Sequence, residues 1–385
     1  MDTKRIIIKD VLNPKKEELY EAARILREGG LVAFPTETVY GLGGNALDGQ
    51  ASRKIYAAKG RPSDNPLIAH ISSMEELKPL VREIPEAGEI LAKAYWPGPL
   101  TLVFPKSSRV PYSTTGGLDT VAVRMPSDPV ARKLIALAGV PVAAPSANTS
   151  GRPSPTTADH VWQDMNGKIE MIVDGGPVGI GLESTIVDVS GPVPVILRPG
   201  AITQEMLEKR LGKVLVDQAV LGPVGEGVRP KAPGMKYKHY APKGELVLVQ
   251  LREETKTELK QTESPLSRQV LRMMTDSGKT LRLDKESFYL AWQVNLAAQK
   301  KKQTGVSVGV ICTDETLGEY DGVIIRSIGT RTSADSLAHN LYRVLREFDD
   351  LGVEFIYSES FSETNLGRAV MNRLSKAAGY HVEQI

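Results

Sequence analysis

Residues 59–70 read KGRPSDNPLIAH, a polar loop that follows a predicted helix over 51–58 and leads into a predicted strand over 67–71. Lys59 and Arg61 alternate here with glycine and proline, which disfavour a helix, and the loop has little apolar surface to bury in a core. Such a segment is better suited to holding a multiply charged anion than to building structure. Its position at a strand end indicates an α/β protein, since these proteins keep their ligands there.

Other segments have the same form, an apolar strand that runs into a polar loop: FPTETVYGLG at 34–43, VAVRMP at 121–126 and AAPSAN at 143–148. Strand-like and helix-like segments alternate through the first 211 residues, and Gly or Pro bounds several of them. One predicted helix carries an apolar stripe from Leu19 to Leu26, begins at an Asn13-Pro14 cap and ends at Gly29. The pattern predicts an α/β domain over residues 1–211 with a twisted, mixed sheet.

The composition changes after Leu211. Residues 212–244 show no clear periodicity and are rich in Gly, Pro and Lys, and MKYKHYAP at 235–242 is too aromatic and basic for an inert tether. A long segment of this kind is usually a linker or a functional covering loop, so we expect a linker that serves as a lid. From residue 245 to 385 the strand and helix alternation returns, which predicts a smaller, Rossmann-like open-sheet α/β domain.

The bulk composition is that of a globular protein, with 41% hydrophobic and 24% charged residues in 385 and a net charge of +2. Cys312, the one cysteine, excludes a disulfide framework and a cysteine-rich metal site; it lies in a predicted buried strand and is expected to be structural. The five histidines show no paired metal spacing. The amino-terminal apolar run is too short for a signal peptide and no segment approaches a membrane span, so we expect a cytoplasmic enzyme.

Several familiar catalytic motifs are missing. The sequence has no Walker-type phosphate loop and no nucleophile elbow. GGPVGIG at 175–181 resembles a dinucleotide fingerprint only superficially, because it contains proline and precedes a strand. The chemistry must therefore come from the polar residues at the strand ends.

Those residues are cations, hydroxyls and amides, gathered in the first domain. Arg forks bind carboxylate or phosphate and Lys acts as a point charge, so the set suits a substrate with both phosphates and a carboxylate. Catalysis would then rest on positioning and charge stabilisation. Each residue also has a structural alternative: Arg124 or Arg198 alone can be a surface ion-pair partner, Thr36 or Ser184 a turn cap, and His70 a structural histidine.

At these positions the chain closely resembles the YrdC-type threonylcarbamoyl-AMP synthases in their long two-domain form. The resemblance covers nearly the whole chain, and so many long motifs in the same order make it specific. The matching segments are FPTETVYGLG at 34–43, KGRPSDNPLIAHI at 59–71, YWPGPLTLVF at 95–104, VAVRMPSDP at 121–129, APSANTSGRPSPT at 144–156, ESTIVDV at 183–189, ILRPGAIT at 196–203, RPKAPGMKYKHYAP at 229–242 and GRAVMNRLSKAA at 367–378.

The resemblance implies a reaction and a set of roles. L-threonine and bicarbonate give a carbamate that attacks the α-phosphate of ATP and releases pyrophosphate, and a partner transfers the threonylcarbamoyl group to the adenosine beside the anticodon of ANN-decoding tRNAs. Lys59 and Arg61 are the implied catalytic cations. The implied threonine and carbamate side comprises Thr36, His70, Arg124, Ala144 and Ser184. The implied ATP side comprises Lys59, Ser63, Thr120, Ser146, Asn148, Ser154, Arg198 and, closing over the nucleotide from the linker, Tyr240.

Mg²⁺ is expected to arrive with ATP, since no dedicated carboxylate cage is visible. A downstream threonylcarbamoyl-transferase partner is expected, direct contact of this chain with tRNA is left open, and no contact with a membrane is expected. Two competing interpretations remain at this point. A carbamoyl-adenylate-handling carbamoyltransferase of the hydrogenase-maturation type would need zinc-binding cysteines, which one cysteine cannot supply. A non-catalytic RNA-binding module is disfavoured by the near-balanced charge and the lack of RNP-type aromatic motifs.

Overall fold

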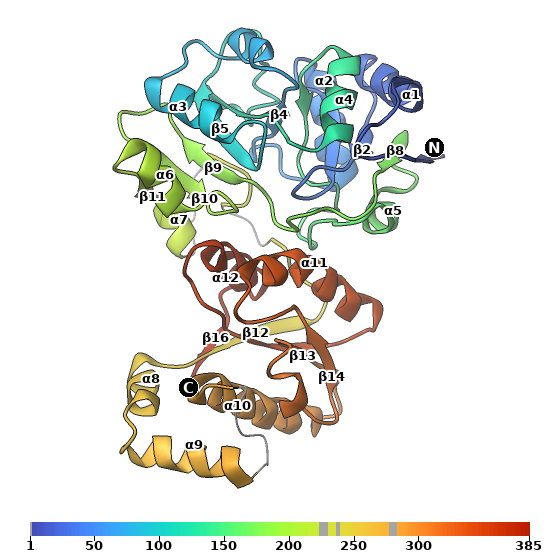
Figure 1. Cartoon of the computed structure of the whole chain (residues 1–385). Coiled ribbons are helices and arrows are strands. Elements are labelled where there is room, and N and C mark those ends of the chain that lie inside the picture. Colours follow the sequence, from blue (N-terminus) through green and yellow to red (C-terminus); the bar gives the residue numbers. More distant parts are fainter. Residues whose placement is uncertain (1, 223–229, 236–238, 277–282) are drawn as a thin grey trace. The chain divides into compact units, whose positions relative to one another are not determined.

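The chain divides into two compact units, residues 1–239 and 240–385 (Figure 1). The computed structural model describes residues 2–222, 230–235, 239–276 and 283–385. The division falls inside the segment predicted as a linker. The predicted domain boundaries at 211 and 245 stay predictions.

The first unit is built on one mixed sheet, as predicted. Two parallel pairs at one edge are followed by three antiparallel pairs, and parallel and antiparallel pairs then alternate to the other edge. In the described residues its strands follow the order β1 (Lys4–Ile7), β8 (Met171–Asp174), β2 (Val32–Phe34), β3 (Gly41–Asn45), β7 (Val142–Ala143), β4 (Ile68–His70), β6 (Thr120–Arg124), β5 (Leu100–Pro105), β9 (Thr185–Asp188), β10 (Val195–Arg198) and β11 (Leu215–Val216).

Helices pack around this sheet and bury its main core. They are α1 (Lys16–Arg27), α2 (Gly49–Lys59), α3 (Glu86–Tyr95), α4 (Pro129–Ala138), α5 (Ala158–Met165), α6 (Gln204–Leu211) and the short α7 (Gln218–Leu221), with 3₁₀ turns at Met74–Glu76 and Lys78–Leu80. The predicted stripe of α1 is buried, and it packs against α4 (Figure 1). The predicted Asn13-Pro14 cap is wrong. The cap is Lys15, whose backbone N–H donates to the Glu18 carboxylate at 3.1 Å, so the first turn closes two residues later.

Sequence patterning missed strand β3, because its sequence GLGGN is poor in β-forming residues. Packing explains the glycines. A Cβ added at Gly43 would lie 2.7 Å from Phe34 Cε1 and 2.8 Å from Val142 Cγ1, on the two neighbouring strands. The close approach of those strands therefore requires glycine at this point, whatever its intrinsic propensity.

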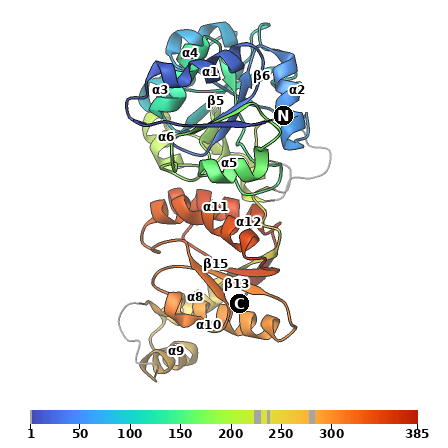
Figure 2. The ribbon, with the colours of Figure 1, turned by 90° about the vertical axis from the view of Figure 1, so that its right-hand side faces the viewer.

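The second unit has a parallel sheet with helices on both faces, which confirms the predicted open-sheet fold. In the described residues the strand order is β14 (Ile324–Ser327), β13 (Val308–Cys312), β15 (Phe355–Glu359), β12 (Glu245–Gln250) and β16 (Val382–Gln384). Figure 2 shows α11 (Ala334–Asp350) and α12 (Leu366–Ala377) on one face, and α8 (Glu253–Lys260) and α10 (Lys285–Lys302) on the other; α9 (Pro265–Asp276) packs on α8 and α10. Leu317–Glu319 forms a short 3₁₀ turn, and Cys312 is a buried free thiol in β13 whose Sγ donates to Arg326 O at 3.7 Å.

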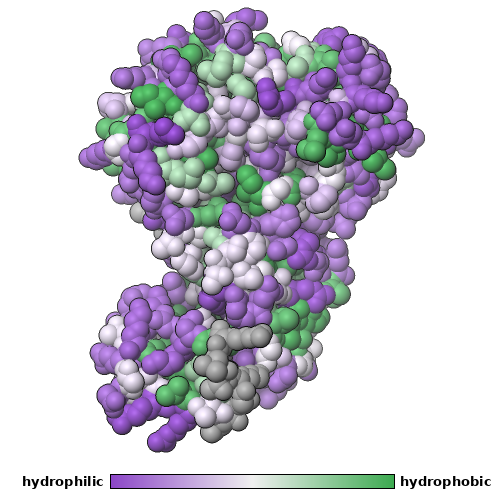
Figure 3. Space-filling model, in the orientation of Figure 1, coloured by the Kyte–Doolittle hydropathy of each residue, from purple (hydrophilic) through white to green (hydrophobic). Residues whose placement is uncertain are grey.

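In the described part of the chain, no helix is long and apolar enough to cross a membrane. The face of the molecule seen in Figure 3 is mostly hydrophilic, with apolar residues scattered over it. The apolar residues that matter for the fold lie in the cores under the helices.

Candidate functional site

Strand register places several of the predicted site residues in one row across the first sheet. His70 in β4 pairs with Arg124 in β6, and Arg124 pairs with Thr101 in β5. Thr101 pairs with Ile186 in β9, which in turn pairs with Arg198 in β10. Paired residues point to the same face, and neighbouring strands lie about 4.8 Å apart, so the row extends roughly 20 Å.

The face that carries this row has an apolar floor and its own cover. The floor and cover form one buried cluster, Ile68, Val103, Ala122, Ile186, Leu197, Ala219, Ala232 and Met235. Residues that alternate with the floor positions along the strands, such as Val121 and Leu102, belong to the main core on the opposite face. Residues 230–235, which we call the covering segment, therefore pack onto the face that bears the polar row.

Arg124 is buried and held by the loop after β2. Its Nη1 donates to Thr38 Oγ1 at 2.9 Å, and its Nη2 lies 2.7 Å from Glu37 Oε1. Neither Nη2 nor the Glu37 oxygens make a well-directed hydrogen bond within the described structure. Burial by itself would raise the pKa of Glu37, but the charge and N–H groups of Arg124 outweigh it and hold that pKa below its usual value. Thr36 supports the loop, since its hydroxyl donates to Val39 O at 2.7 Å and contacts Thr38 Oγ1.

His70 is neutral at physiological pH. Burial, reinforced by the nearby positive charge of Arg124, lowers its pKa to about 3. Its Nδ1 lies 3.1 Å from Ile68 O, which assigns the proton to Nδ1 and leaves Nε2 as an acceptor. The ring meets Phe34 edge-on, with 6.5 Å between centroids.

Ser184 joins the row through two hydroxyl contacts. Its Oγ lies 2.8 Å from Thr101 Oγ1 and accepts from Arg198 Nη2 at 3.2 Å. Arg198 also donates from Nε to Ser184 O at 3.1 Å and from Nη1 to Pro233 O of the covering segment at 3.4 Å. A bulge interrupts the β10 register just before Arg198, a common device for re-aiming a side chain beside a site.

Lys59 and the loop after β7 form a second group. The left-handed Gly60, with φ +61°, ends α2 and leaves Lys59 at the last helical position. The Lys59 ammonium is almost fully buried and donates to Ser146 O at 2.6 Å and to Asn148 O. Ser146 Oγ in turn donates to Asn148 Oδ1 at 2.5 Å. Lys59 thus fixes the backbone of the loop that the sequence predicts to line ATP.

The remaining predicted residues lie in neighbouring loops. Arg61 is buried and donates to Asn65 O and Pro66 O, the backbone that leads into β4, while Ser63 in the same loop is exposed. Ala144 donates its N–H to Ile68 O at 2.9 Å. Thr120 begins β6, four residues before Arg124, so these two ends of one strand are separated by roughly 13 Å.

Ser154 and Tyr240 are held by contacts outside the strand pairing. Ser154 Oγ donates to the Glu183 carboxylate at 2.6 Å, beside Ser184. Tyr240 belongs to the second unit, where its ring stacks on Tyr342 with 5.2 Å between centroids. Its predicted role over the nucleotide stays a prediction, and the neighbouring residues 236–238 and 223–229 of the predicted lid lie outside the described residues.

The surface ion-pair alternative is wrong for Arg124 and Arg198, since both are buried. Sequence reasoning missed Glu37, Thr38 and Thr101 as members of the site. Glu37 and Thr38 lie inside the quoted 34–43 motif, so their place in that motif could have identified them as site residues. Thr101 is one hydroxyl in an apolar strand, and only strand register connects it to Arg124.

A sheet with a covered polar row, followed by a parallel open-sheet unit, defines a two-domain YrdC-like α/β class. A family model described as "Telomere recombination" matches residues 24–200, and a second, "Threonylcarbamoyl-AMP synthase, C-terminal domain", matches residues 202–379. The threonylcarbamoyl-AMP synthase of Pyrococcus abyssi is 48% identical, covering 94% of this chain and 95% of the relative. That of Bacillus subtilis is 43% identical over 99% of both.

Solved structures agree with this grouping. A crystal structure of P. abyssi Sua5 complexed with L-threonine is 45% identical and covers 100% of both chains, with a TM-score of 0.84. This chain belongs to the threonylcarbamoyl-AMP synthase family.

Proposed function

We propose that this protein makes L-threonylcarbamoyl-AMP from L-threonine, bicarbonate and ATP and releases pyrophosphate. The observation that carries the proposal is the row of His70, Arg124 and Arg198 on the covered face of the sheet, with Lys59 and Arg61 in the neighbouring loops. The arrangement offers one set of groups to a carboxylate and another to phosphates. The P. abyssi relative crystallised with L-threonine supports the choice of amino acid.

Arg124 is the proposed partner of the threonine carboxylate. Its Nη2 lies close to Glu37 without a well-directed hydrogen bond, so an incoming carboxylate can offer the guanidinium better geometry than it has in this structure. The Ser184 hydroxyl, already in a network with Thr101 and Arg198, can bind the hydroxyl of threonine. A site built around that hydrogen bond disfavours valine, because its own polar groups would be left unpaired.

Neutral His70 can accept a hydrogen bond at Nε2 from the carbamate N–H. Thr36 would shape this side of the site through the Glu37 loop, and Ala144 would bring the main chain close to the carbamate. These roles require no proton transfer from His70, which is consistent with its low pKa of about 3.

The proposed chemical step joins two anions. A carbamate oxygen bonds to the α-phosphorus of ATP while the bond from that phosphorus to the pyrophosphate oxygen breaks. Lys59, Arg61 and Arg198 would offset the repulsion and stabilise the charge that develops at phosphorus. The proposed contacts to the rest of ATP are Ser63, Thr120, Ser146, Asn148, Ser154 and Tyr240.

The covering segment would keep water away from the product, a mixed anhydride that hydrolyses easily. Mg²⁺ would enter as the complex with ATP, bound mainly by phosphates and water, as is usual for this ion. Within the described residues no group of three or more His, Cys, Asp or Glu side chains could hold a metal ion. We propose that the reaction takes place in the cytoplasm, where the product would pass to a threonylcarbamoyl transferase acting on tRNA.

The test is ATP–pyrophosphate exchange by the purified full chain, with and without threonine and bicarbonate. The expected result is exchange that needs both, with the adenylate identified by mass spectrometry. Exchange driven by carbamoyl phosphate in their place would favour a carbamoyltransferase. Absence of any exchange by a folded protein that still binds tRNA would favour the RNA-binding alternative.

A further inference from the structure

The second unit contains a cavity of about 740 Å³ at the carboxyl ends of its parallel strands. Gln250, the last residue of β12, and Leu251 after it form one wall, and Ser360 and Phe361, which follow β15, form another. The two strands are neighbours in the sheet. The volume is in the range of small-molecule sites, about 300–1,000 Å³.

This cavity lies at a topological switch point. The chain leaves β12 toward α8 and α10 on one face of the sheet, and it leaves β15 toward α12 on the opposite face (Figure 2). Ligands of open α/β sheets bind in the crevice that such divergent connections create. The fold therefore supplies a binding position that the proposed catalytic reaction does not use.

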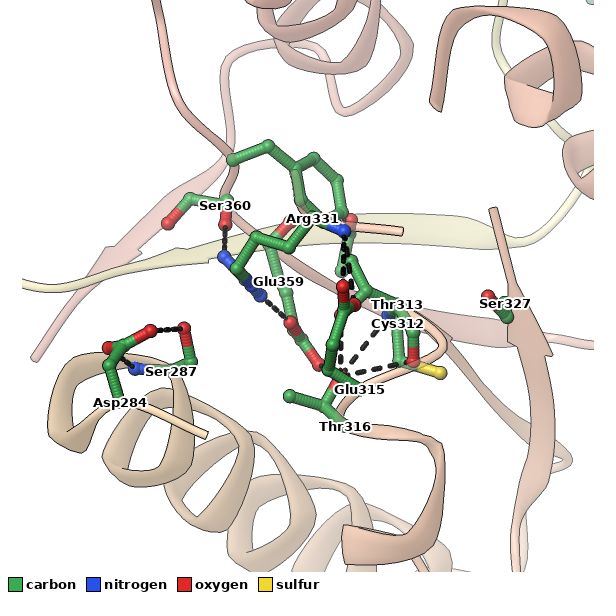
Figure 4. A network of polar contacts seen from close by, with 12 residues as sticks. Asp284, Ser287, Cys312, Thr313, Glu315, Thr316, Ser327, Arg331, Glu359 and Ser360 are labelled. Carbon is green, nitrogen blue, oxygen red and sulfur yellow. Dashed lines mark hydrogen bonds and ion pairs between the residues drawn. The ribbon is translucent and has the colours of Figure 1, made fainter. Parts of the chain in front are cut away.

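A fixed guanidinium forms one side of the cavity. Arg331 donates from Nη1 to Ser360 O at 3.0 Å and pairs through Nη2 with the fully buried Glu359 (Figure 4). Thr316 Oγ1 and Tyr320 OH also donate to Glu359, at 2.5 and 2.6 Å. The Nε of Arg331 has no partner within the described structure.

Stability alone explains this arrangement poorly, because a buried ion pair contributes little net stability. Its clear effect is to hold the Arg331 guanidinium in one orientation at the cavity wall. A guanidinium fixed in this way retains N–H donors for an anionic group of a ligand.

Carboxylates make up much of the remaining lining. Asp284 caps α10 and accepts from Ser287 N at 2.9 Å and from Ser287 Oγ at 2.7 Å; Figure 4 shows both at the start of that helix. Glu286 and Glu363 also line the cavity, as do Glu253 and Lys256, which pair at 2.6 Å. The lining thus has more carboxylates than cations.

These carboxylates argue against a nucleotide. The turn from β12 into α8 reads QLRE and has no glycine, and Glu253 and Glu254 occupy the first turn of α8. Asp284 and Glu286 occupy the corresponding position at α10. Phosphates bind helix starts that present free N–H groups without acidic side chains, which is not the case here.

We propose that this cavity binds a free α-amino acid with an apolar side chain. Its carboxylate would bind Arg331, and its ammonium group would face Asp284, Glu286 and Glu363. Leu251, Leu290 and Phe361 supply the apolar lining for the side chain. The guanidinium and the carboxylates of the lining match the two charges of the zwitterion, and neither an amine nor a carboxylic acid alone satisfies both.

The test is isothermal titration calorimetry of the full chain with L-leucine, L-methionine and L-phenylalanine. Each amino acid is compared with its two half-molecules, the amine that lacks the carboxylate and the carboxylic acid that lacks the ammonium group. For leucine these are isoamylamine and 4-methylpentanoate, and AMP is the nucleotide probe. We expect saturable binding of at least one amino acid, with each half-molecule weaker by about tenfold to a hundredfold, the loss of one charged hydrogen-bonded contact. Hydrogen exchange should slow at 250–256, 284–290 and 360–363 when the amino acid binds.

Arg331→Gln should weaken binding by the same factor of about ten to a hundred. Arg326→Gln is the matched control, since Arg326 pairs with Glu347 outside the cavity lining. Because Arg331→Gln leaves Glu359 buried without its cation, the double change Glu286→Gln and Glu363→Gln tests the proposed ammonium contacts without that risk. Unchanged affinity in both variants, protection confined to the first unit, tighter binding of AMP, or no binding of any amino acid would overturn the proposal. ATP–pyrophosphate exchange, measured in parallel, reports separately on the catalytic proposal.

Discussion

Arg124→Gln separates the structural role of the buried ion pair from its role in binding. The side chains of Arg124 and Glu37 are 4% and 14% exposed, so the substitution leaves a buried carboxylate without its cation. Breaking a buried pair in this way costs about 3–5 kcal/mol of unfolding free energy. Loss of the guanidinium should also weaken threonine binding by at least about tenfold, the value of one charged hydrogen bond.

Glu37→Gln, alone and combined with Arg124→Gln, completes a double-mutant cycle. Removing both charges eliminates the unpaired carboxylate, so we expect the double variant to regain about 2–3 kcal/mol relative to Arg124→Gln. Threonine affinity should stay low, because neither variant restores the guanidinium. The stability would be measured by urea unfolding at pH 7, and the affinity by the threonine dependence of pyrophosphate exchange.

Two results would refute this reasoning. Wild-type threonine dependence in Arg124→Gln would show that the carboxylate binds elsewhere. Strictly additive stability losses in the cycle would show that Arg124 and Glu37 do not interact, despite the 2.7 Å between them.

Other changes test neighbouring parts of the site. Lys59→Met should lower ATP–pyrophosphate exchange by more than about a hundredfold with an unchanged near-UV spectrum, since it removes the ammonium that fixes the 146–148 loop and that we propose to face the nucleotide; activity near wild type would contradict this. His70 has a pKa of about 3 when folded against 6.5 unfolded, so the unfolded chain binds the extra proton and stability falls as pH drops below 6.5. Between pH 7 and pH 5 the wild type should therefore lose about 2 kcal/mol more unfolding free energy than His70→Gln does. Equal losses in the two proteins would disprove the burial argument. Gly43→Ala should lower the free energy of unfolding, measured by urea unfolding, by about 1–3 kcal/mol, because the added Cβ would overlap Phe34 and Val142. Ser184→Ala should reduce discrimination between threonine and valine by about tenfold, measured as the ratio of kcat/KM values, and an unchanged ratio would remove Ser184 from the hydroxyl site.

The sequence by itself determined the class of fold and most of the chemistry. Apolar spacing identified the buried stripe of α1, and apolar runs located most of the strands, because burial imposes periodicity on local sequence. The polar loops at 34–43, 59–70 and 143–148 were recognisable as site segments, because they contain polar or charged residues and prolines, whereas core elements are apolar and regular. Sequence reasoning failed at β3, because its glycines are required by the close approach of the neighbouring strands and not by strand propensity.

Only the tertiary structure decided which of those polar residues meet. His70, Arg124 and Arg198 are far apart along the chain, and parallel or antiparallel register on a single sheet brings them into one row. The pairing of Glu37 with Arg124 and the packing of the covering segment onto the same face likewise depend on contacts between distant segments. Local sequence cannot encode such contacts, because register is set by the packing of the whole sheet.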